Sequence, residues 1–408
     1  MYLKKNGGIR LLFDVSFLIY LIAYFVFYGD GAGFSTIRLV ATVMFGLAVI
    51  LQFLVHIRTI DILFIWYLLF IIFGGLSIVW ARYDSAVTGT APSMIRILIV
   101  FVGLKGRLQD EKDIDVILGI YLIAVVFRIM YIANLMISFY SIQYFYIHRF
   151  GDNFQYNSNE TAMMACICLL ILIYWSQKYK FKKWYIFVVF FFMATIVITQ
   201  SKKGMIGIVL GVIIFTILKE NGAKGKLKKI LLAIIAIITI IEMLTNVPEL
   251  YDLIGYRFDQ FNDAIFGTLT IGTSTGNRIM LIKQALDVWM NHIFIGVGLN
   301  NFSSYQSIGD IGYYAHNNYA ELLADVGLIG FCIYYYLPVK LCFAKVQSKD
   351  TMGVFFKTLM FVLLVFDIGA VSYNAVAFII FYAIYFYKMH INTSHMKKYK
   401  KIYKDGVQ

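Results

Sequence analysis

Long apolar runs separated by short polar connections organise almost the whole chain. About 20 consecutive apolar residues suffice to cross a bilayer as a helix, and many runs here approach that length. Twelve such runs can be read, at 11–28, 37–55, 60–80, 91–105, 114–138, 160–177, 183–200, 204–218, 228–245, 319–341, 354–372 and 374–390. The pattern predicts an all-α polytopic membrane protein with about twelve transmembrane helices.

Composition supports the same class. Of the 408 residues, 61% are hydrophobic and only 14% are charged, which is far more apolar than a soluble domain. The first run, 11–28, is long enough to span and lacks a small-residue cleavage site, so we expect a retained helix rather than a signal peptide. The four cysteines, which lie in or beside apolar runs, are expected to be packing residues: Cys166, Cys168, Cys332 and Cys342.

Lysine and arginine recur in alternate connections and thereby predict orientation. The basic connections carry Lys4, Lys5 and Arg10; His56 and Arg58; Lys105, Arg107 and Lys112; Lys178, Lys180, Lys182 and Lys183; Lys219, Lys224, Lys226, Lys228 and Lys229; Lys340 and Lys345; and the tail from Lys388 to Lys404. Both termini are therefore expected in the cytoplasm. The net charge of +13 is explained by this bias and by attraction to anionic lipid, and a nucleic-acid partner is not expected.

The opposite connections are poor in Lys and Arg, and their exceptions are informative. Cations or histidines occur there as Lys202 and Lys203 in the turn 201–204, as His148 and Arg149 beside Asn157 and Asn159, and as Arg257, Arg278, Lys283, His292 and His316 in the long connection. Cations placed against the topological bias suggest an anionic substrate at the outer face.

The expected organisation has four parts: transmembrane helices 1–9 over 1–245, a large extracytoplasmic loop over 246–318, helices 10–12 over 319–390, and a basic cytoplasmic tail over 391–408. Apolar residues at helical spacing predict two amphipathic helices within the loop. Their stripes are Leu250, Ile254, Phe258, Phe261 and Ile265, and Ile279, Ile282, Leu286 and Trp289. Gly296 and Gly298 permit a sharp turn or a close approach of backbone.

The most informative polar segment begins at His316, followed by Asn317 and Asn318. Asparagine is a good N-cap and an apolar helix follows, so His316 is expected beside the first turn of that helix. The positive end of a helix keeps a histidine neutral and suits an anion. The alternative interpretation is a solvated loop histidine before a well-capped helix.

Three motifs carry a family resemblance: SKKG at 201–204, GNRIMLIKQALDVWMNHIFIGVGLNNF at 276–302, and HNNYAELLADVGLIG at 316–330. In this order they resemble the O-antigen ligase and Wzy-type polysaccharide polymerase family. A fainter similarity is the helix start Asn159-Glu160-Thr161-Ala162. The motifs cover roughly the C-terminal half, and the N-terminal spans are similar only in hydropathy.

The resemblance implies a glycosyltransferase of the bacterial cytoplasmic membrane that acts on polyprenyl-pyrophosphate-linked oligosaccharides at the outer face, without metal or cofactor. A flippase and a chain-length regulator are candidate partners. Arg278 and His316 correspond to the family's arginine and histidine, whereas Lys202 stands where members commonly have arginine. Lysine acts as a point charge and does not grip phosphate bidentately, and Lys203 would double the charge.

The expected catalytic residues are His316, Arg278 and Glu321, and the expected pyrophosphate or glycan ligands are Lys202, Lys203, Arg278, Asn317, Asn159 and Arg149. Cations would stabilise the departing diphosphate, and His316 would either deprotonate the acceptor or hydrogen-bond the pyrophosphate, with inversion at the anomeric carbon.

Glu321 and Asp325 are four residues apart and share a helix face. The favoured interpretation is ionic pairing with Arg96 or Arg128 across the bundle. In the alternative, one carboxylate orients His316 or takes the acceptor proton.

Two other activities remain open. Ligases and polymerases share these motifs, and a polymerase of capsule, O-antigen or exopolysaccharide is favoured. The rival from another class is a transporter or lipid-linked oligosaccharide flippase. Carriers commonly have repeated halves and Gly- or Pro-broken helices, which are not evident in this sequence. Asp113-Ile114-Asp115 looks like a metal-binding pair but lies in a short connection with no soluble domain, so we expect no metal site there.

Overall fold

The computed structural model describes residues 2–27, 33–56, 61–139, 149–151, 154, 156–180, 183–246, 274–308 and 313–405. Within these ranges every regular element is a helix. The elements are α1 (Tyr2–Val26), α2 (Phe34–His56), α3 (Ile62–Leu76), the short η1 (Ser77–Val79), α4 (Asp84–Arg107), α5 (Glu111–Phe139), α7 (Ser158–Lys178), α8 (Trp184–Ile198), α9 (Lys202–Lys219), α10 (Ala223–Asn246), α13 (Ser274–Asn291), the short η4 (Phe302–Ser304), α14 (Asn318–Cys342), α15 (Thr351–Asp367) and α16 (Val376–Asp405).

Each of the twelve apolar runs overlaps one of these helices. In the described part of the chain, 7 helices are long and apolar enough to cross a membrane: Gly7–Val26, Phe34–Leu54, Ile62–Val79, Asp84–Arg107, Glu111–Ser138, Ser158–Lys178 and Asn318–Cys342. Trp184–Ile198 and Val376–Ile391 are shorter apolar helices. The protein is therefore a multi-pass membrane protein, while the total of twelve spans stays a prediction.

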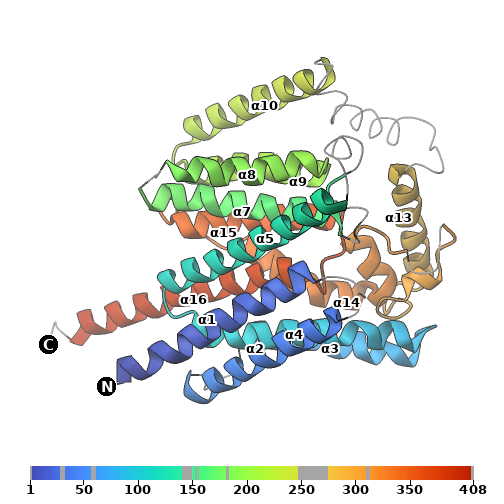
Figure 1. Ribbon diagram of the computed structural model, residues 1–408, viewed down its shortest axis with the longest axis horizontal. Coiled ribbons are helices and arrows are strands. Elements are labelled where there is room, and N and C mark those ends of the chain that lie inside the picture. Colours follow the sequence, from blue (N-terminus) through green and yellow to red (C-terminus); the bar gives the residue numbers. More distant parts are fainter. Residues whose placement is uncertain are drawn as a thin grey trace.

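The long helices run side by side in alternating directions (Figure 1). The start of α1 and the end of α16 lie at one end of the bundle, and α13 lies at the other, across the direction of the long helices. We call these the terminal end and the loop end. The positive-inside prediction makes the terminal end cytoplasmic and the loop end external.

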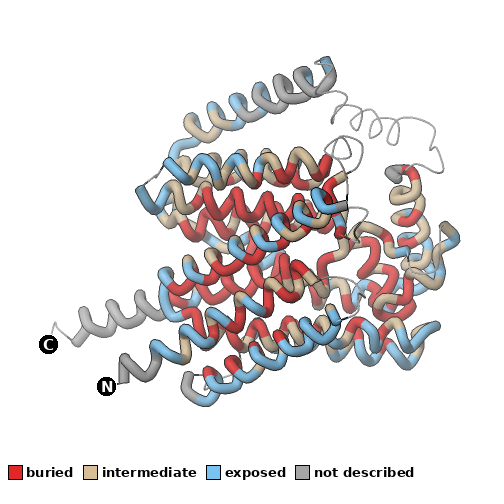
Figure 2. The backbone as a smooth tube through the Cα atoms, in the orientation of Figure 1, coloured by how far each residue is buried: buried red, intermediate tan, exposed pale blue. Residues whose placement is uncertain are grey.

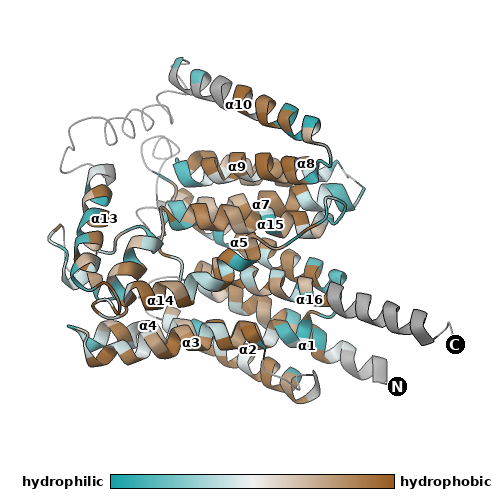
Figure 3. Ribbon diagram, turned by 180° about the vertical axis from the view of Figure 1, so that it is seen from behind, coloured by the Kyte–Doolittle hydropathy of each residue, from teal (hydrophilic) through white to brown (hydrophobic). Residues whose placement is uncertain are grey.

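Burial separates a packed interior from an apolar exterior. Figure 2 shows buried residues concentrated along the central helices, of which α7 buries most of its length. Outer helices such as α2 instead expose large apolar side chains, for example Leu39 and Leu54, and Figure 3 shows apolar colouring on these outer helices. Exposed apolar surface on this scale is expected where lipid, rather than water, covers a helix.

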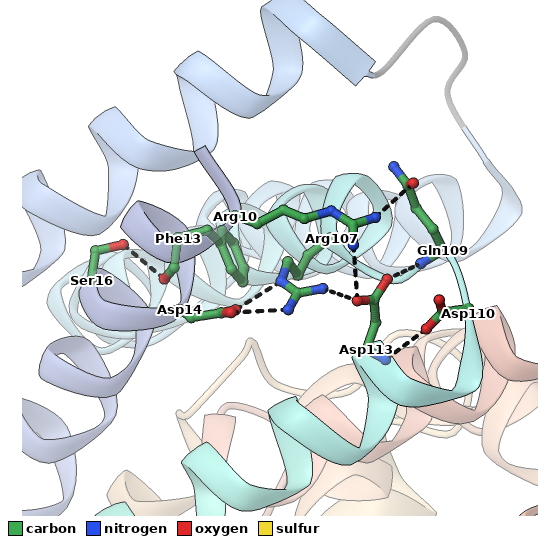
Figure 4. Close-up of polar contacts among 8 residues, drawn as sticks. All are labelled: Arg10, Phe13, Asp14, Ser16, Arg107, Gln109, Asp110 and Asp113. Atoms are coloured by element: carbon green, nitrogen blue, oxygen red, sulfur yellow. Dashed lines mark hydrogen bonds and ion pairs between the residues drawn. The ribbon is translucent and has the colours of Figure 1, made fainter. Parts of the chain in front are cut away.

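A network of ion pairs joins three helices at the terminal end (Figure 4). Arg107 at the end of α4 is only 4% exposed, and its guanidinium donates to both carboxylate oxygens of Asp14, at 2.8 and 2.9 Å. Asp113 at the start of α5 accepts from Arg107 and also from Arg10, the latter at 3.3 Å. The buried charges thus compensate one another and tie α1, α4 and α5 together.

Asp115 likewise connects two helices, α5 and α7. Its carboxylate accepts hydrogen bonds from the Tyr174 hydroxyl and the Trp175 indole, both at 3.0 Å, and from Lys178 at 2.6 Å. Both carboxylates of the Asp113-Ile114-Asp115 motif are therefore engaged in contacts between helices.

The backbone of α14 is broken at Gly327, where φ is +61°. The segment after α13 fills the break: the amides of Leu328 and Ile329 donate to the carbonyls of Ile293 and Phe294, at 2.8 and 3.1 Å. In the opposite direction, the amides of Val297 and Gly298 donate to the carbonyls of Ala324 and Asp325. A break inside an apolar helix is tolerated when such contacts satisfy the freed groups.

The close contact between α14 and the segment after α13 requires glycine at two positions, Gly327 and Gly296. A Cβ on Gly327 would lie 2.4 Å from the carbonyl carbon of Phe294, and one on Gly296, at φ +65°, would lie 2.4 Å from the backbone of Asp325. The prediction of a turn or close approach at Gly296 is confirmed. The expectation that no span is broken by glycine was wrong, and it no longer counts against a transporter.

A small second core holds the loop end together. It consists of Leu281, Ala285, Phe302, Ala315, Ala320 and Ala324. The predicted amphipathic helix at 279–289 is confirmed as α13, but Leu281 and Ala285 form its buried face, while Leu286 is exposed. The other predicted loop helix, at 250–265, lies outside the described residues. This core joins α13 to the first half of α14.

Candidate functional site

A cavity of about 340 Å³ opens at the loop end, a volume in the range of ligand sites. It lies among the segment before α7, the first turn of α9, α13, the turn before α14 and the turn after α15. Its lining residues are Arg149, Tyr156, Asn157, Asn159, Met163, Lys203, Arg278, Tyr314, His316, Gly369 and Ala370.

The cavity brings together five of the side chains predicted from sequence: Arg149, Asn159, Lys203, Arg278 and His316. They come from four segments far apart in the chain. Arg149 and Arg278 are permanent cations, whereas burial and the nearby charges of Arg278 and Arg149 lower the pKa of Lys203 to about 7. No aspartate or glutamate occurs among the described lining residues. A concave site with several basic side chains and no acid among its described lining residues favours an anion.

Asn159 connects Arg149 to the start of α9. The Arg149 guanidinium donates to the side-chain oxygen of Asn159 and to the carbonyl of Thr199, both at 3.1 Å. The Ser201 hydroxyl donates to the same Asn159 oxygen at 2.9 Å. Ser201 is also the N-cap of α9, so this bonding holds Arg149 beside the first turn of α9.

Lys203, not Lys202, lines the cavity. The Lys203 side chain lies over Gly369 in the turn after α15, where an added Cβ would approach its Cε to 2.4 Å. Consecutive helical residues point about 100° apart, because a turn takes 3.6 residues. The two lysines are therefore not equivalent, although the sequence treats them alike.

His316 has a left-handed backbone, with φ +55°, and its ring lies 4.1 Å from the ring of Tyr314. Burial lowers the pKa of His316 to about 3, and the nearby charges of Arg278 and Lys203 act in the same direction. The imidazole is therefore neutral at pH 7. The sequence predicts a neutral histidine from the helix N-terminus, whereas burial is the main cause here.

Asn317 lies beside His316 but caps the helix. Its side-chain oxygen accepts from the amide of Ala320 at 3.0 Å, and its amide nitrogen donates to the carbonyl of Ile368 at 3.0 Å. The capping prediction agrees with the structure. Asn317 does not line the cavity, and its predicted contact with substrate stays a prediction.

Glu321 and Asp325 are buried in the first half of α14, and neither lines the cavity. Glu321 accepts the amide of Ala315 at 2.5 Å. Asp325 accepts the amides of Asn300 and Phe302, at 2.7 and 2.8 Å. Both carboxylates thus hold loop backbone.

The favoured expectation of ionic pairing with Arg96 or Arg128 was therefore wrong. Arg128 pairs with Glu160 at 3.2 Å, and Arg96 lies over the ring of Tyr24 at 4.9 Å. The physical reason is that backbone amides, which every loop residue carries, satisfy the two carboxylates in place of cations.

Sequence reasoning named Asn157 beside Arg149 but did not select five other lining residues: Tyr156, Met163, Tyr314, Gly369 and Ala370. Tyr314 had a detectable signal, since it stands two residues before His316 in the motif. Gly369 and Ala370 lie just after the apolar helix α15, and no sequence motif at these positions indicates a binding site. Tyr156 is fixed by its hydroxyl, which donates to the carbonyl of Val26.

We also searched for residues that could hold a metal ion. The described part of the chain contains no group of three or more His, Cys, Asp and Glu residues positioned to hold a metal ion. Among the described lining residues, the basic side chains are those of Arg149, Lys203 and Arg278.

Comparison with known families adds one finding. Residues 186–335 match the family described as O-antigen ligase, which confirms the resemblance over that segment. A search of the curated proteins gave no match. The matched segment supplies Lys203, Arg278, Tyr314 and His316, while the remaining lining residues lie outside it.

Proposed function

On the premise that residues 186–335 form an O-antigen ligase segment, we propose that this protein is a polymerase of lipid-linked glycans. It would join polyprenyl-pyrophosphate-linked oligosaccharide repeat units into capsular, O-antigen or exopolysaccharide chains at the outer face of a bacterial cytoplasmic membrane. The observation that carries the proposal is the cavity that gathers Arg149, Lys203, Arg278 and a neutral His316 at the loop end.

The cations would bind the diphosphate of the donor and stabilise the charge that develops as it leaves. The acceptor hydroxyl oxygen attacks the anomeric carbon from the opposite side, the bond from that carbon to the diphosphate oxygen breaks, and its electron pair leaves with the diphosphate. The hydroxyl proton passes to His316 or to the departing diphosphate. The configuration inverts. In this mechanism protein cations supply the positive charge, so metal is not required.

His316 has two roles that its neutral state permits. An imidazole nitrogen with a free lone pair can take the proton of the acceptor hydroxyl, and the N–H of the same ring can donate to a diphosphate oxygen. The protonated ring would lie among cations, which opposes full transfer of the proton. A departing diphosphate needs little base assistance, and both roles remain within the proposal.

The activity is tested by what accumulates when the gene is deleted. Without a polymerase, the lipid-linked unit should still reach the outer leaflet, and cells should carry single-unit glycan in place of long chains. Long glycan that remains on the polyprenyl carrier would instead identify a ligase, the activity named in the family's description. Confinement of the unit to the inner leaflet would identify a flippase. Lipid-linked glycan can be extracted and sized to distinguish these results.

Orientation is tested by cysteine labelling on a background without native cysteines. Ser307 lies at the loop end and Gln347 lies between α14 and α15, and both are exposed. The two single variants are Ser307→Cys and Gln347→Cys. We expect a membrane-impermeant maleimide to label Cys at 307 in intact cells and Cys at 347 only after permeabilisation. Labelling of both positions from the same side would contradict the predicted topology.

The two lysines of the turn 201–204 provide a matched pair. Lys203→Ala should lower kcat/KM by about 10- to 100-fold, which corresponds to the loss of one hydrogen bond to a charged group. Lys202→Ala should have a much smaller effect, because Lys202 does not line the cavity. The measurement is extension of a purified lipid-pyrophosphate repeat unit by the purified protein. Equal losses in the two variants would contradict the position of Lys203 in the site.

A further inference from the structure

His316 is held in a strained conformation by its two chain neighbours. A left-handed φ, here +55°, is uncommon outside glycine and persists only where the surroundings enforce it. On one side, Asn317 is fixed by its bonds to Ala320 and Ile368. On the other side, Ala315 is fixed through its amide, which donates to the carboxylate of Glu321 at 2.5 Å.

Glu321 occupies a location that suits this contact. It lies in the first turn of α14, and folding of that turn directs its carboxylate back to the segment before the helix. Glu321 is 1% exposed, and the Ala315 that it contacts belongs to the small core of the loop end. The carboxyl oxygen accepts a backbone amide that would otherwise be buried without a partner, and loss of such a bond is costly.

From this geometry we infer that Glu321 is a positioning residue, which holds the turn 314–317 so that the imidazole of His316 faces the bound diphosphate and acceptor. The inference rests on the proposed function. Glu321 does not itself exchange a proton with the acceptor, because its carboxylate does not line the cavity and is engaged by the backbone of Ala315. Its contribution to the reaction passes through His316.

Two substitutions of Glu321 separate positioning from proton transfer. Glu321→Gln keeps a side-chain oxygen that can accept the Ala315 amide, so this variant should retain most of kcat/KM. Glu321→Ala removes the acceptor and leaves the turn free to shift, which should lower kcat/KM by about 100-fold, as expected for a misplacement of about 1 Å. If Gln is as damaging as Ala, Glu321 exchanges protons and the inference is wrong.

A double-mutant cycle separates positioning of His316 from a general structural role. His316→Asn removes the imidazole with a residue that tolerates left-handed backbone. In that background, Glu321→Ala should lower kcat/KM by less than about threefold, because residues that act as a unit are not additive. A full additional loss would show that Glu321 acts independently of His316 and would overturn the inference.

Asp325 provides the matched control. It is buried on the same half of α14 but accepts the amides of Asn300 and Phe302 rather than an amide of the turn 314–317. Any loss of kcat/KM caused by Asp325→Asn should therefore persist in full in the His316→Asn background. If the Asp325 effect also vanishes there, non-additivity with His316 is not specific to Glu321, and the inference fails.

A binding measurement keeps the inference distinct from the proposed function. Inorganic pyrophosphate should bind the purified wild-type protein, as measured by calorimetry, and binding should weaken in Arg278→Ala. Absence of pyrophosphate binding by the wild type would contradict the proposed site itself. With wild-type binding present, an additive double-mutant cycle would contradict only the positioning role of Glu321.

Discussion

Replacement of Arg278 by alanine is expected to lower kcat/KM for glycan extension by about 10³-fold, while the amount of protein in the membrane stays unchanged. Arg278 stands near the start of α13 and lines the cavity, and its charge contributes to the lowered pKa of His316. Removal of a preorganised group that stabilises developing negative charge costs about 10²–10³-fold, and arginines on transferring phosphoryl groups can contribute more. Extension of a purified lipid-pyrophosphate unit measures the loss.

Two further variants make this test specific. Arg278→Lys should recover only part of the activity, because an ammonium group keeps the charge but loses the planar, bidentate fork. Lys283→Ala on the same helix removes an exposed cation outside the cavity and should leave kcat/KM close to the parental value. A parental rate in Arg278→Ala, or an equal loss in Lys283→Ala, would reject Arg278 as the specific diphosphate ligand.

The helices could be predicted from sequence because each apolar run reports its own burial in lipid or in the bundle. The break in α14 could not. Glycine within an apolar run is compatible with an unbroken helix, and Gly327 becomes a break only because Ile293 and Phe294 supply carbonyls to the amides of Leu328 and Ile329. Those partners lie more than 30 residues earlier in the chain, and no local pattern relates them.

Some of the site could be predicted because positive charge in an outward connection is unexpected for a membrane protein. This argument selected Arg149, Lys203, Arg278 and His316, all of which line one cavity, but it also selected Lys283 and His292, which do not line it. His148 and Arg257, selected in the same way, lie outside the described residues. The charge pattern could not choose between Lys202 and Lys203. Which of the two side chains points into the cavity depends on the residue at which α9 begins, and Ser201 sets that residue as its N-cap.

The sequence was least informative about buried carboxylates. Opposite charges are visible in a sequence, so Arg96 and Arg128 looked like natural partners for Glu321 and Asp325. Backbone amides carry no residue-specific signal, although they are the groups that these two carboxylates accept. The interpretation that one carboxylate orients His316 is the one on which the positioning role of Glu321 is built.

His316→Asn is the second variant for which we expect a large effect, a decrease in kcat/KM of about 10²–10⁴-fold. This is the range for loss of a group that donates a hydrogen bond to developing charge or moves a proton in the transition state. Asparagine is preferable to alanine here because it tolerates the left-handed backbone at φ +55° and so separates loss of the imidazole from loss of the fold. His316→Ala should be equally inactive but less stable. Membrane abundance and thermal unfolding of both variants provide the control.

The pH dependence tests the same residue in the unmodified protein. Because the pKa of His316 is lowered to about 3, the imidazole stays neutral when the pH falls from 8 to 5.5, and protonation would remove it only near pH 3. The profile of kcat/KM, which reports ionisation in the free protein, should therefore show no decrease on the acid side centred near the ordinary histidine pKa of about 6.5. On the alkaline side kcat/KM should fall as Lys203, whose pKa burial lowers to about 7, loses its proton. An acid-side decrease centred near the ordinary histidine pKa that disappears in His316→Asn would show that His316 titrates normally and is not enclosed among Arg278 and Lys203. A parental rate in His316→Asn would exclude both the base role and the phosphate-binding role.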